Sequence, residues 1–452
     1  MLKSKFFLLT LALVVALSMA LACAPSSTGT SGNGKSPILI GYVGNVSSPG
    51  TKPCMDLAQI AVDEINESGG VLGRPLKLIV EDGKGETSTA VSAAQRMIMG
   101  TRPVAYFSEG RSEIALALKE TSAGLYKDYP HIQINNGAAD YEVTEKLVSQ
   151  YDKYKFFFRD FEFAQYPWYY NQNLTIMKDL IKAKKIAILY EDLIWTRVYR
   201  EGSPVTNLPG MKEYVTKKGL FEVVYEKNVK PRSGMWLPVL ENVANSGAEA
   251  MFIYTSWYTD VEVLAKQWAD SSAKDIPILA TGGILGSYGF WDMTGGKCNG
   301  MITHFWNEDQ VPVTPKLFPL VKKAQKAGIP IQFHVLLAYN DVYGLKAAME
   351  KANTTTDIEA MIKALETTQY EGAMGPSGYH PEKVEPWFHS GMISDPKDPT
   401  NLMFPDKSHI PWKQWQGKDK VQLIYTSPGF MSYAHPELYK SPAQLRSESG
   451  IK

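Results

Sequence analysis

The chain has 452 residues, of which 44% are hydrophobic, 11% aromatic and 21% charged, with 47 basic and 47 acidic side chains. Single cores rarely grow beyond about 250–300 residues, so this length predicts two domains, and the composition excludes disorder for most of the chain. The balanced charge lacks the basic excess of a nucleic-acid-binding protein, and three cysteines are too few for a disulfide-built scaffold.

Residues 1–22 are predicted to be a secretion signal. Two lysines precede an apolar run, Phe6–Leu21, that is short for a membrane-spanning helix. The small residues before Cys23 resemble a bacterial lipoprotein box, so we expect lipidation of Cys23, with plain cleavage as the alternative. Residues 23–36 are rich in Ser, Thr, Gly and Pro, which is typical of a flexible tether. These segments predict a periplasmic or extracytoplasmic domain, lipid-anchored to the membrane.

Short apolar runs then alternate with segments of helical spacing. The predicted strands are residues 38–43, 76–80, 103–107, 132–134, 156–158, 185–190, 221–226 and 250–254. The predicted helices are residues 55–67, 88–99, 113–122, 166–183, 211–218, 236–245 and 261–269. Such alternation predicts parallel sheets with right-handed crossovers, in which ligands bind at the carboxyl ends of the strands.

The string LAQIAVDEINESGGVLGR, Leu57–Arg74, resembles a helix and glycine turn of the branched-chain amino acid-binding family of type I periplasmic binding proteins, which serve ABC transporters. Ala338–Val342 and Tyr370–Gly375 are similar to later motifs of that family, and the resemblance covers residues 38–425. It implies an α/β fold of two Rossmann-like lobes with parallel sheets. Three hinge crossings would join the lobes, and the ligand would lie in the interlobe cleft.

The resemblance also implies the boundaries of the lobes. These are 37–158 and 303–378 for the first lobe, 159–302 and 379–440 for the second, and 441–452 for a C-terminal tail. An insertion at about 380–411 contains two Asp-Pro pairs, which favour turns. We expect this insertion to decorate the second lobe, or else to cover the cleft.

The family's ligand-binding positions fall on loops that follow strands. Together with the neighbouring Arg111, they correspond here to Ser112, Asn136, Gly137, Ala138, Ala139, Trp195, Trp257, Tyr258 and Gly283. The Ser112 hydroxyl and nearby helix N-terminal amides would suit a carboxylate. Trp195 and Trp257 would cover the ligand, with core packing as the alternative for both.

Two polar groups of the family are missing from this sequence. Ala139 stands where the family has a threonine, and the Gly282-Gly283 loop lacks the glutamate that holds an ammonium group in amino acid-binding members. The loop 108–113 is more charged than usual. Arg111 could bind a carboxylate, its glutamate neighbours could bind an amine, or these side chains could pair with one another on the rim.

No motif calls for catalysis or for a bound metal. The seven histidines show no metal-binding spacing, and there is no nucleophile elbow or phosphate-binding loop. No catalytic residue, metal or cofactor is therefore predicted. Cys54 and Cys298 are expected to be free thiols, because a disulfide between them would hinder closure of the cleft.

Signal, tether and family motifs together predict the solute-binding protein of an ABC transporter. It would capture a small amino acid-like or carboxylate ligand by hinge closure and deliver it to a permease. A ligand sensor on the same fold is the alternative, and a hydrolase is a weaker third reading. We expect a monomer that binds no nucleic acid and that contacts the membrane only through its lipid anchor.

Overall fold

The computed structural model describes residues 36–161, 167–304 and 310–449. The predicted signal, Cys23 and the tether up to residue 35 lie outside the described residues. Residues 37–452 form one compact unit, and the fold given below is that of this unit.

The first sheet has five parallel strands in the order β2-β1-β3-β4-β5. They are β1 (Ile38–Gly44), β2 (Leu76–Asp82), β3 (Ala105–Ser108), β4 (Ile132–Asn135) and β5 (Phe157–Arg159). The inner strands are almost continuously buried, as expected when helices cover both faces of a parallel sheet.

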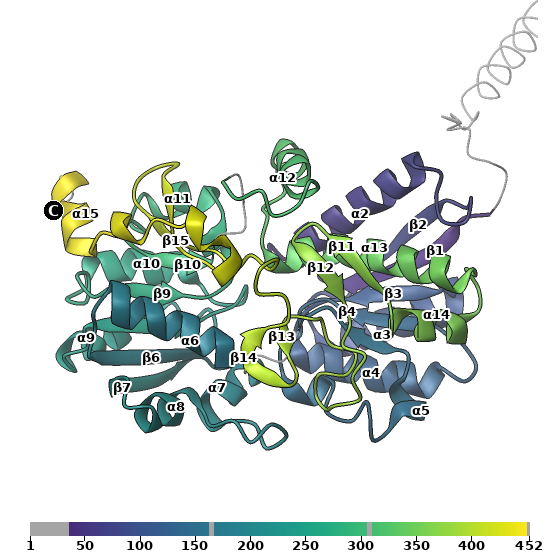
Figure 1. Ribbon diagram of the computed structural model, residues 1–452, viewed down its shortest axis with the longest axis horizontal. Helices are drawn as coiled ribbons and strands as arrows, with labels where there is room; N and C mark the ends of the chain where they lie inside the picture. The colour runs from purple at the N-terminus through teal and green to yellow at the C-terminus, as the bar shows by residue number, and fades with distance from the viewer. Residues whose placement is uncertain (1–35, 162–166, 305–309, 450–452) are drawn as a thin grey trace, which may run out of the picture. The chain divides into compact units, whose positions relative to one another are not determined.

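The helices of the first lobe come from two distant parts of the chain. They are α2 (Thr51–Glu67), α3 (Thr87–Arg96), α4 (Ser112–Leu125), α5 (Tyr151–Tyr154), α13 (Phe333–Ala352) and α14 (Ile358–Leu365). Helix α13 packs along α2, although the two are more than 250 residues apart in sequence (Figure 1). Nearby are the hairpin β11 (Gln369–Gly372) and β12 (Gly375–Gly378) and, earlier in the chain, α12 (Leu317–Lys326).

The second sheet has seven strands in the order β16-β15-β10-β9-β8-β6-β7. They are β6 (Lys185–Glu191), β7 (Glu222–Val229), β8 (Ala250–Tyr254), β9 (Ile278–Ala280), β10 (Ile302–His304), β15 (Trp412–Trp415) and β16 (Val421–Tyr425). The first five are parallel, and β15 and β16 add to them in antiparallel fashion. The sheet is therefore mixed, whereas strand–helix alternation predicted only parallel pairing.

Helices of the second lobe connect these strands. They are α6 (Pro167–Thr175), which continues as a π-helix over Ile176–Leu180, then α7 (Arg197–Glu201), α8 (Met211–Lys217), α9 (Leu237–Asn245), α10 (Val261–Asp270) and α11 (Gly289–Thr294). The expected tail contains α15 (Pro442–Ser449), where Arg446 donates a hydrogen bond to the main-chain oxygen of Lys274.

The chain passes between the two sheets three times, after β5, after β10 and between β12 and β15. The predicted α/β fold with two lobes is thus confirmed. Both cysteines of the described region, Cys54 and Cys298, are buried free thiols, as expected. Within the described ranges, no helix has both the length and the apolar character needed to cross a membrane.

Two boundaries differ from those implied by the resemblance. The boundary at residue 303 falls inside β10, which pairs with β9 and β15 of the second sheet. The segment 379–393, expected in the second lobe and in its insertion, lies against the first sheet. Ser390 forms a parallel bridge to Arg159, and the His389 ring stacks on Phe158 with 4.0 Å between ring centroids. The open edge of β5 offers this segment both hydrogen bonds and an apolar face.

After this segment the insertion continues toward the second lobe. A small hairpin, β13 (Ser394–Asp395) and β14 (Asp398–Leu402), contacts α6. The insertion therefore touches both lobes, and Ile393 and Ile410 border the cavity described next.

Candidate ligand-binding site

A cavity of about 180 Å³ lies at the carboxyl ends of strands from both sheets. This volume is about six times the ~30 Å³ that one water occupies in the liquid, so the cavity can hold a small organic molecule. The first lobe contributes loops after β1, β3 and β4, the second contributes loops after β6, β8 and β9, and the start of α13 completes the lining.

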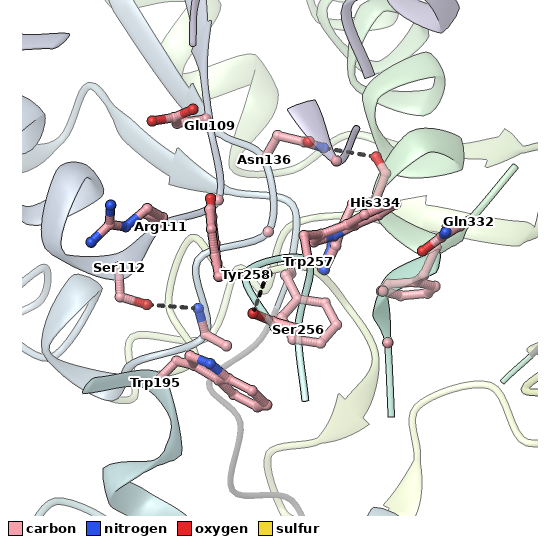
Figure 2. Close-up of a pocket in the computed structure, with 18 of the residues that line it drawn as sticks. Glu109, Arg111, Ser112, Asn136, Trp195, Ser256, Trp257, Tyr258, Gln332 and His334 are labelled. Carbon is pink, nitrogen blue, oxygen red and sulfur yellow. Dashed lines mark hydrogen bonds between the residues drawn. The ribbon is translucent and has the colours of Figure 1, made fainter. Parts of the chain in front are cut away.

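Ser112 begins helix α4 at the edge of this cavity. Its Oγ accepts hydrogen bonds from the main-chain N–H groups of Ala139 at 3.3 Å and Asp140 at 3.2 Å. Figure 2 draws one of these bonds as a dashed line from Ser112. Both bonds use lone pairs of the hydroxyl, so its hydrogen remains available for a ligand. With the amides of the first helical turn, this arrangement suits an anionic group such as a carboxylate.

The loop after β4 is held rigidly beside Ser112. Asn136 Nδ2 donates to Asp160 and, at 3.0 Å, to the main-chain oxygen of His334. The Gly137 N–H donates to Asp160 Oδ1 at 2.7 Å. Gly137 has a φ of +97°, and a Cβ there would lie 2.6 Å from His334 Nδ1, so a larger residue does not fit.

Ala138 is the one predicted site residue that does not border the cavity. Its N–H donates to Asn135 Oδ1 at 2.9 Å and its carbonyl accepts from Arg159 at 3.2 Å, so it faces the core. The structure brings the other nine together around the cavity: Arg111, Ser112, Asn136, Gly137, Ala139, Trp195, Trp257, Tyr258 and Gly283.

Aromatic side chains from the second lobe form one wall of the cavity. Trp195 follows β6, and its Nε1 donates to the buried Glu191 at 2.7 Å, which fixes the orientation of the indole. Trp257 and Tyr258 follow β8, and Trp257 packs so close to Gly50 of the first lobe that a Cβ on Gly50 would lie 2.6 Å from the ring. The two lobes therefore meet across this aromatic wall.

The missing acid at Gly282 and Gly283 has a steric explanation. Both residues have positive φ, +59° and +69°. A Cβ on either would lie 3.0 Å or less from a main-chain oxygen of the β8 loop. This close backbone approach requires glycine and leaves no room for a glutamate.

Arg111 is held by protein groups. Its Nη1 donates to the main-chain oxygen of Gly85 at 2.9 Å, its Nε lies 3.8 Å from Glu113, and its guanidinium lies 5.3 Å from the centre of the Tyr258 ring. The pairing of Arg111 with Glu113, one of the arrangements considered from the sequence, is present in this structure. The contact with Tyr258 also links the two lobes.

Glu109 in the same loop is almost completely buried, at 1% exposure. Its Oε2 accepts hydrogen bonds from the Asn45 N–H at 3.0 Å and the Thr51 hydroxyl at 3.3 Å, while Oε1 has no partner among the described residues. Burial raises the pKa of this carboxyl above its usual range.

Sequence reasoning missed the residues at the start of α13. Gln332, Phe333 and His334 border the cavity, yet they are the N-cap and first two residues of a helix that follows a hinge crossing, so a search of loops after strands does not reach them. Burial lowers the pKa of His334 to about 4, which makes the ring neutral at physiological pH. The sequence offered no signal for these residues.

Sequence reasoning also missed an ion pair that crosses between the lobes. Arg197, at the start of α7, contacts Asp140 at 2.9 Å and Glu142 at 2.9 Å, and its guanidinium lies 4.8 Å from the centre of the Tyr141 ring. Asp140 also accepts from the Glu142 N–H, and burial raises its pKa to about 6. This cluster fastens the second lobe to the first beside the cavity.

No group of three or more His, Cys, Asp or Glu side chains suited to a metal ion occurs in the part of the chain that the structure describes. A cavity between two α/β lobes, with a helix N-terminus on one side and aromatic rings on the other, defines a ligand-binding protein. The chain belongs to the periplasmic binding protein family, whose sequence profile it matches over residues 37–387. The predicted resemblance is thereby confirmed.

Two curated relatives carry related names. The chain is 23% identical over 319 residues to "Leu/Ile/Val-binding protein homolog 3" of Brucella melitensis, covering 68% of this chain and 76% of that protein. It is 25% identical over 309 residues to "Leu/Ile/Val-binding protein BraC3" of Rhizobium johnstonii, covering 68% of this chain and 77% of that protein.

Solved structures share the fold. The branched-chain amino acid transporter substrate binding protein LivJ from Streptococcus pneumoniae, in complex with isoleucine, superposes with a TM-score of 0.65 at 17% identity, covering 86% of this chain and 99% of that one. An ABC transporter solute binding protein from R. palustris, in complex with 4-hydroxybenzoate, superposes with a TM-score of 0.64 at 16% identity, covering 88% and 99%.

Proposed function

We propose that this protein is the extracytoplasmic solute-binding protein of an ABC transporter, which captures a small carboxylate ligand and delivers it to a permease. The observation that carries the proposal is the placement of Ser112 and the N-terminus of α4 at a cavity lined by both lobes. Family membership supports the same role, because it concerns a class of solute-binding proteins.

The binding mode follows from the geometry. The carboxylate would accept hydrogen bonds from the Ser112 hydroxyl and from amides of the first turn of α4. The apolar body would lie against Trp195 and Trp257, which bury it from water. Because the ligand would touch both lobes at once, it would favour the closed arrangement over an open one.

The ligand class is a small amino acid or aromatic acid. Curated relatives are named as Leu/Ile/Val-binding proteins, and related structures contain isoleucine or 4-hydroxybenzoate. All of these ligands combine one carboxylate with an apolar body, which matches the cavity.

Thermal-shift measurements on the mature protein test this function. The panel would contain branched-chain and aromatic amino acids, benzoate and hydroxybenzoates, with leucinamide and benzamide as controls that lack the carboxylate. A true ligand at 100 times its dissociation constant should stabilise the fold by about 2.7 kcal/mol, and its amide should not. Equal stabilisation by acid and amide, or none by any compound, would overturn the proposal.

We also propose that Cys23 is lipidated and that residues 23–36 tether the domain to the membrane surface. The sequence pattern around Cys23 supports this. In cells that express the full chain, the wild-type protein should enter the detergent phase of a Triton X-114 extract, whereas Cys23→Ser should remain in the aqueous phase. Aqueous partitioning of the wild type would contradict lipidation.

A further inference from the structure

His334 presents a polar ring in an otherwise aromatic part of the cavity. It is the second residue of α13, and its ring centroid lies 5.5 Å from that of Phe161 and 6.4 Å from that of Trp257. Figure 2 shows the imidazole beside Trp257, with Ser112 and Arg111 on the other side of Tyr258. The cavity therefore has a polar group at each of two separate places.

The hydrogen-bonding state of His334 differs from that of other buried histidines. His131 Nδ1 contacts the main-chain oxygen of Tyr129, although its Nε2 has no partner among the described residues, and His389 is bonded through both ring nitrogens. By contrast, neither ring nitrogen of His334 has a hydrogen-bond partner among the described residues, and its Nδ1 is fully buried. A histidine that served only for core packing would be expected to keep at least one hydrogen-bond partner, as these others do.

Gln332 adds a second unpaired donor in this part of the lining. Its side chain is only 4% exposed, and its Nε2 has no partner in the described ranges. A buried polar atom without a partner is unfavourable, and native structures keep few of them. Similar unpartnered atoms occur elsewhere among the described residues, but these two belong to residues two positions apart on the wall of one cavity, where a ligand can supply the partners.

The chemistry of the pair restricts what that ligand group can be. Gln332 Nε2 donates only, whereas the neutral imidazole of His334 offers one donor and one acceptor nitrogen. The surrounding rings of Phe161, Phe333 and Trp257 disfavour a second full charge there. A neutral group such as a hydroxyl, which both donates and accepts, fits these conditions.

We propose that His334 and Gln332 form a specificity subsite, which selects carboxylate ligands carrying a hydroxyl or similar neutral hydrogen-bonding group on their apolar body. This inference rests on the proposed function and narrows its ligand class. Purely aliphatic amino acids such as leucine, isoleucine and valine leave the subsite unpaired and bind weakly. Hydroxylated amino acids or aromatic acids satisfy both ends of the cavity.

Isothermal titration calorimetry with matched ligand pairs tests the subsite. The pairs are benzoate and 4-hydroxybenzoate, phenylalanine and tyrosine, and valine and threonine, which differ by one hydroxyl group. In the wild type, the hydroxylated member of at least one pair is expected to bind about tenfold tighter or more. His334→Phe keeps a ring of similar shape but removes the nitrogens, so it should reduce this preference to near one.

Two further variants separate recognition from packing. Gln332→Leu should also lower the preference, while Gln325→Leu, the same change on an exposed position of α12, should not. Circular dichroism and unfolding curves establish whether each variant is folded. If His334→Phe does not fold, Gln332→Leu still tests the subsite.

The outcomes distinguish the inference from the function. If ligands bind but no pair shows a preference, or if the preference survives in both His334→Phe and Gln332→Leu, the subsite is disproved and the solute-binding role stands. If no member of any pair binds, both the subsite and the proposed function are disproved.

Discussion

At the scale of single residues, the site depends on side chains that serve the fold and the cavity at once. Ser112 holds the loop after β4 through two accepted hydrogen bonds and keeps its hydrogen for a ligand. Gly137 belongs to the same loop, and its backbone packs closely against the His334 ring of α13. Changes at these positions should therefore affect binding and packing in separable ways.

Ser112→Ala should weaken binding of a carboxylate ligand by about tenfold or more, because hydrogen bonds to charged groups contribute about 1.5–3 kcal/mol. Calorimetric dissociation constants measure the effect. Ser92→Ala is the control, since Ser92 lies exposed on α3 and bonds only to the main-chain oxygen of Ser88. An unchanged affinity in Ser112→Ala would remove this residue from the site.

Gly137→Ala should destabilise the fold by roughly 1–3 kcal/mol or more, because it combines a positive φ with a steric clash at His334. Gly219→Ala provides the comparison. Its φ is +60°, but nothing lies within 4 Å of the added Cβ, so that variant reports backbone strain alone. Urea unfolding of both variants measures the difference, and equal destabilisation would show that the contact with His334 is unimportant.

At the scale of elements, the start of α7 and the loop after β4 act as a fastener between the lobes. Arg197 reaches across from the second lobe to Asp140 and Glu142, and Asp140 in turn caps the short turn that Glu142 belongs to. An ion pair that exists only when the lobes meet contributes to closure, and thus to ligand retention.

Arg197→Gln should increase the ligand dissociation rate severalfold, because the closed arrangement loses its cross-lobe ion pairs while the cavity lining stays intact. Stopped-flow or surface plasmon resonance measures that rate. Arg200→Gln is a matched control on the same helix, since Arg200 pairs with Asp192 and Glu201 within its own lobe. The same rate in both variants would show that the fastener does not control release.

At the scale of the whole molecule, Asp140 couples stability to pH. Burial raises its pKa to about 6 in the folded protein, above the ordinary value of 3.8. Its protonated form therefore favours folding, and this contribution is complete below about pH 3.8 and is lost as the pH rises through about 6. The Asp140→Asn variant does not titrate at this position and serves as the reference. Between pH 4 and 6, the free energy of unfolding of the wild type should decrease relative to that of this variant. A constant difference would contradict the shift.

The fold was predictable because strand–helix alternation and the family string act over local stretches of sequence. The loops after strands were also predictable, since parallel sheets place them at one edge, and nine predicted residues meet there. His334 and Arg197 were not predictable, because their roles arise from contacts across the hinge and between lobes. The lobe boundary expected at residue 379 was also wrong. The bridge between Ser390 and Arg159 depends on an unpaired edge of the first sheet, which is not visible in the sequence.

The late return of the chain to the first sheet has a consequence for biosynthesis. The buried guanidinium of Arg159 donates a hydrogen bond to the Ser390 hydroxyl, and the edge of β10 is covered by β15. Neither lobe can complete its core until the last quarter of the chain has left the ribosome. If residues 1–22 act as the predicted export signal, the polypeptide would thus stay incompletely folded, and able to thread through a translocation pore, until synthesis is nearly finished.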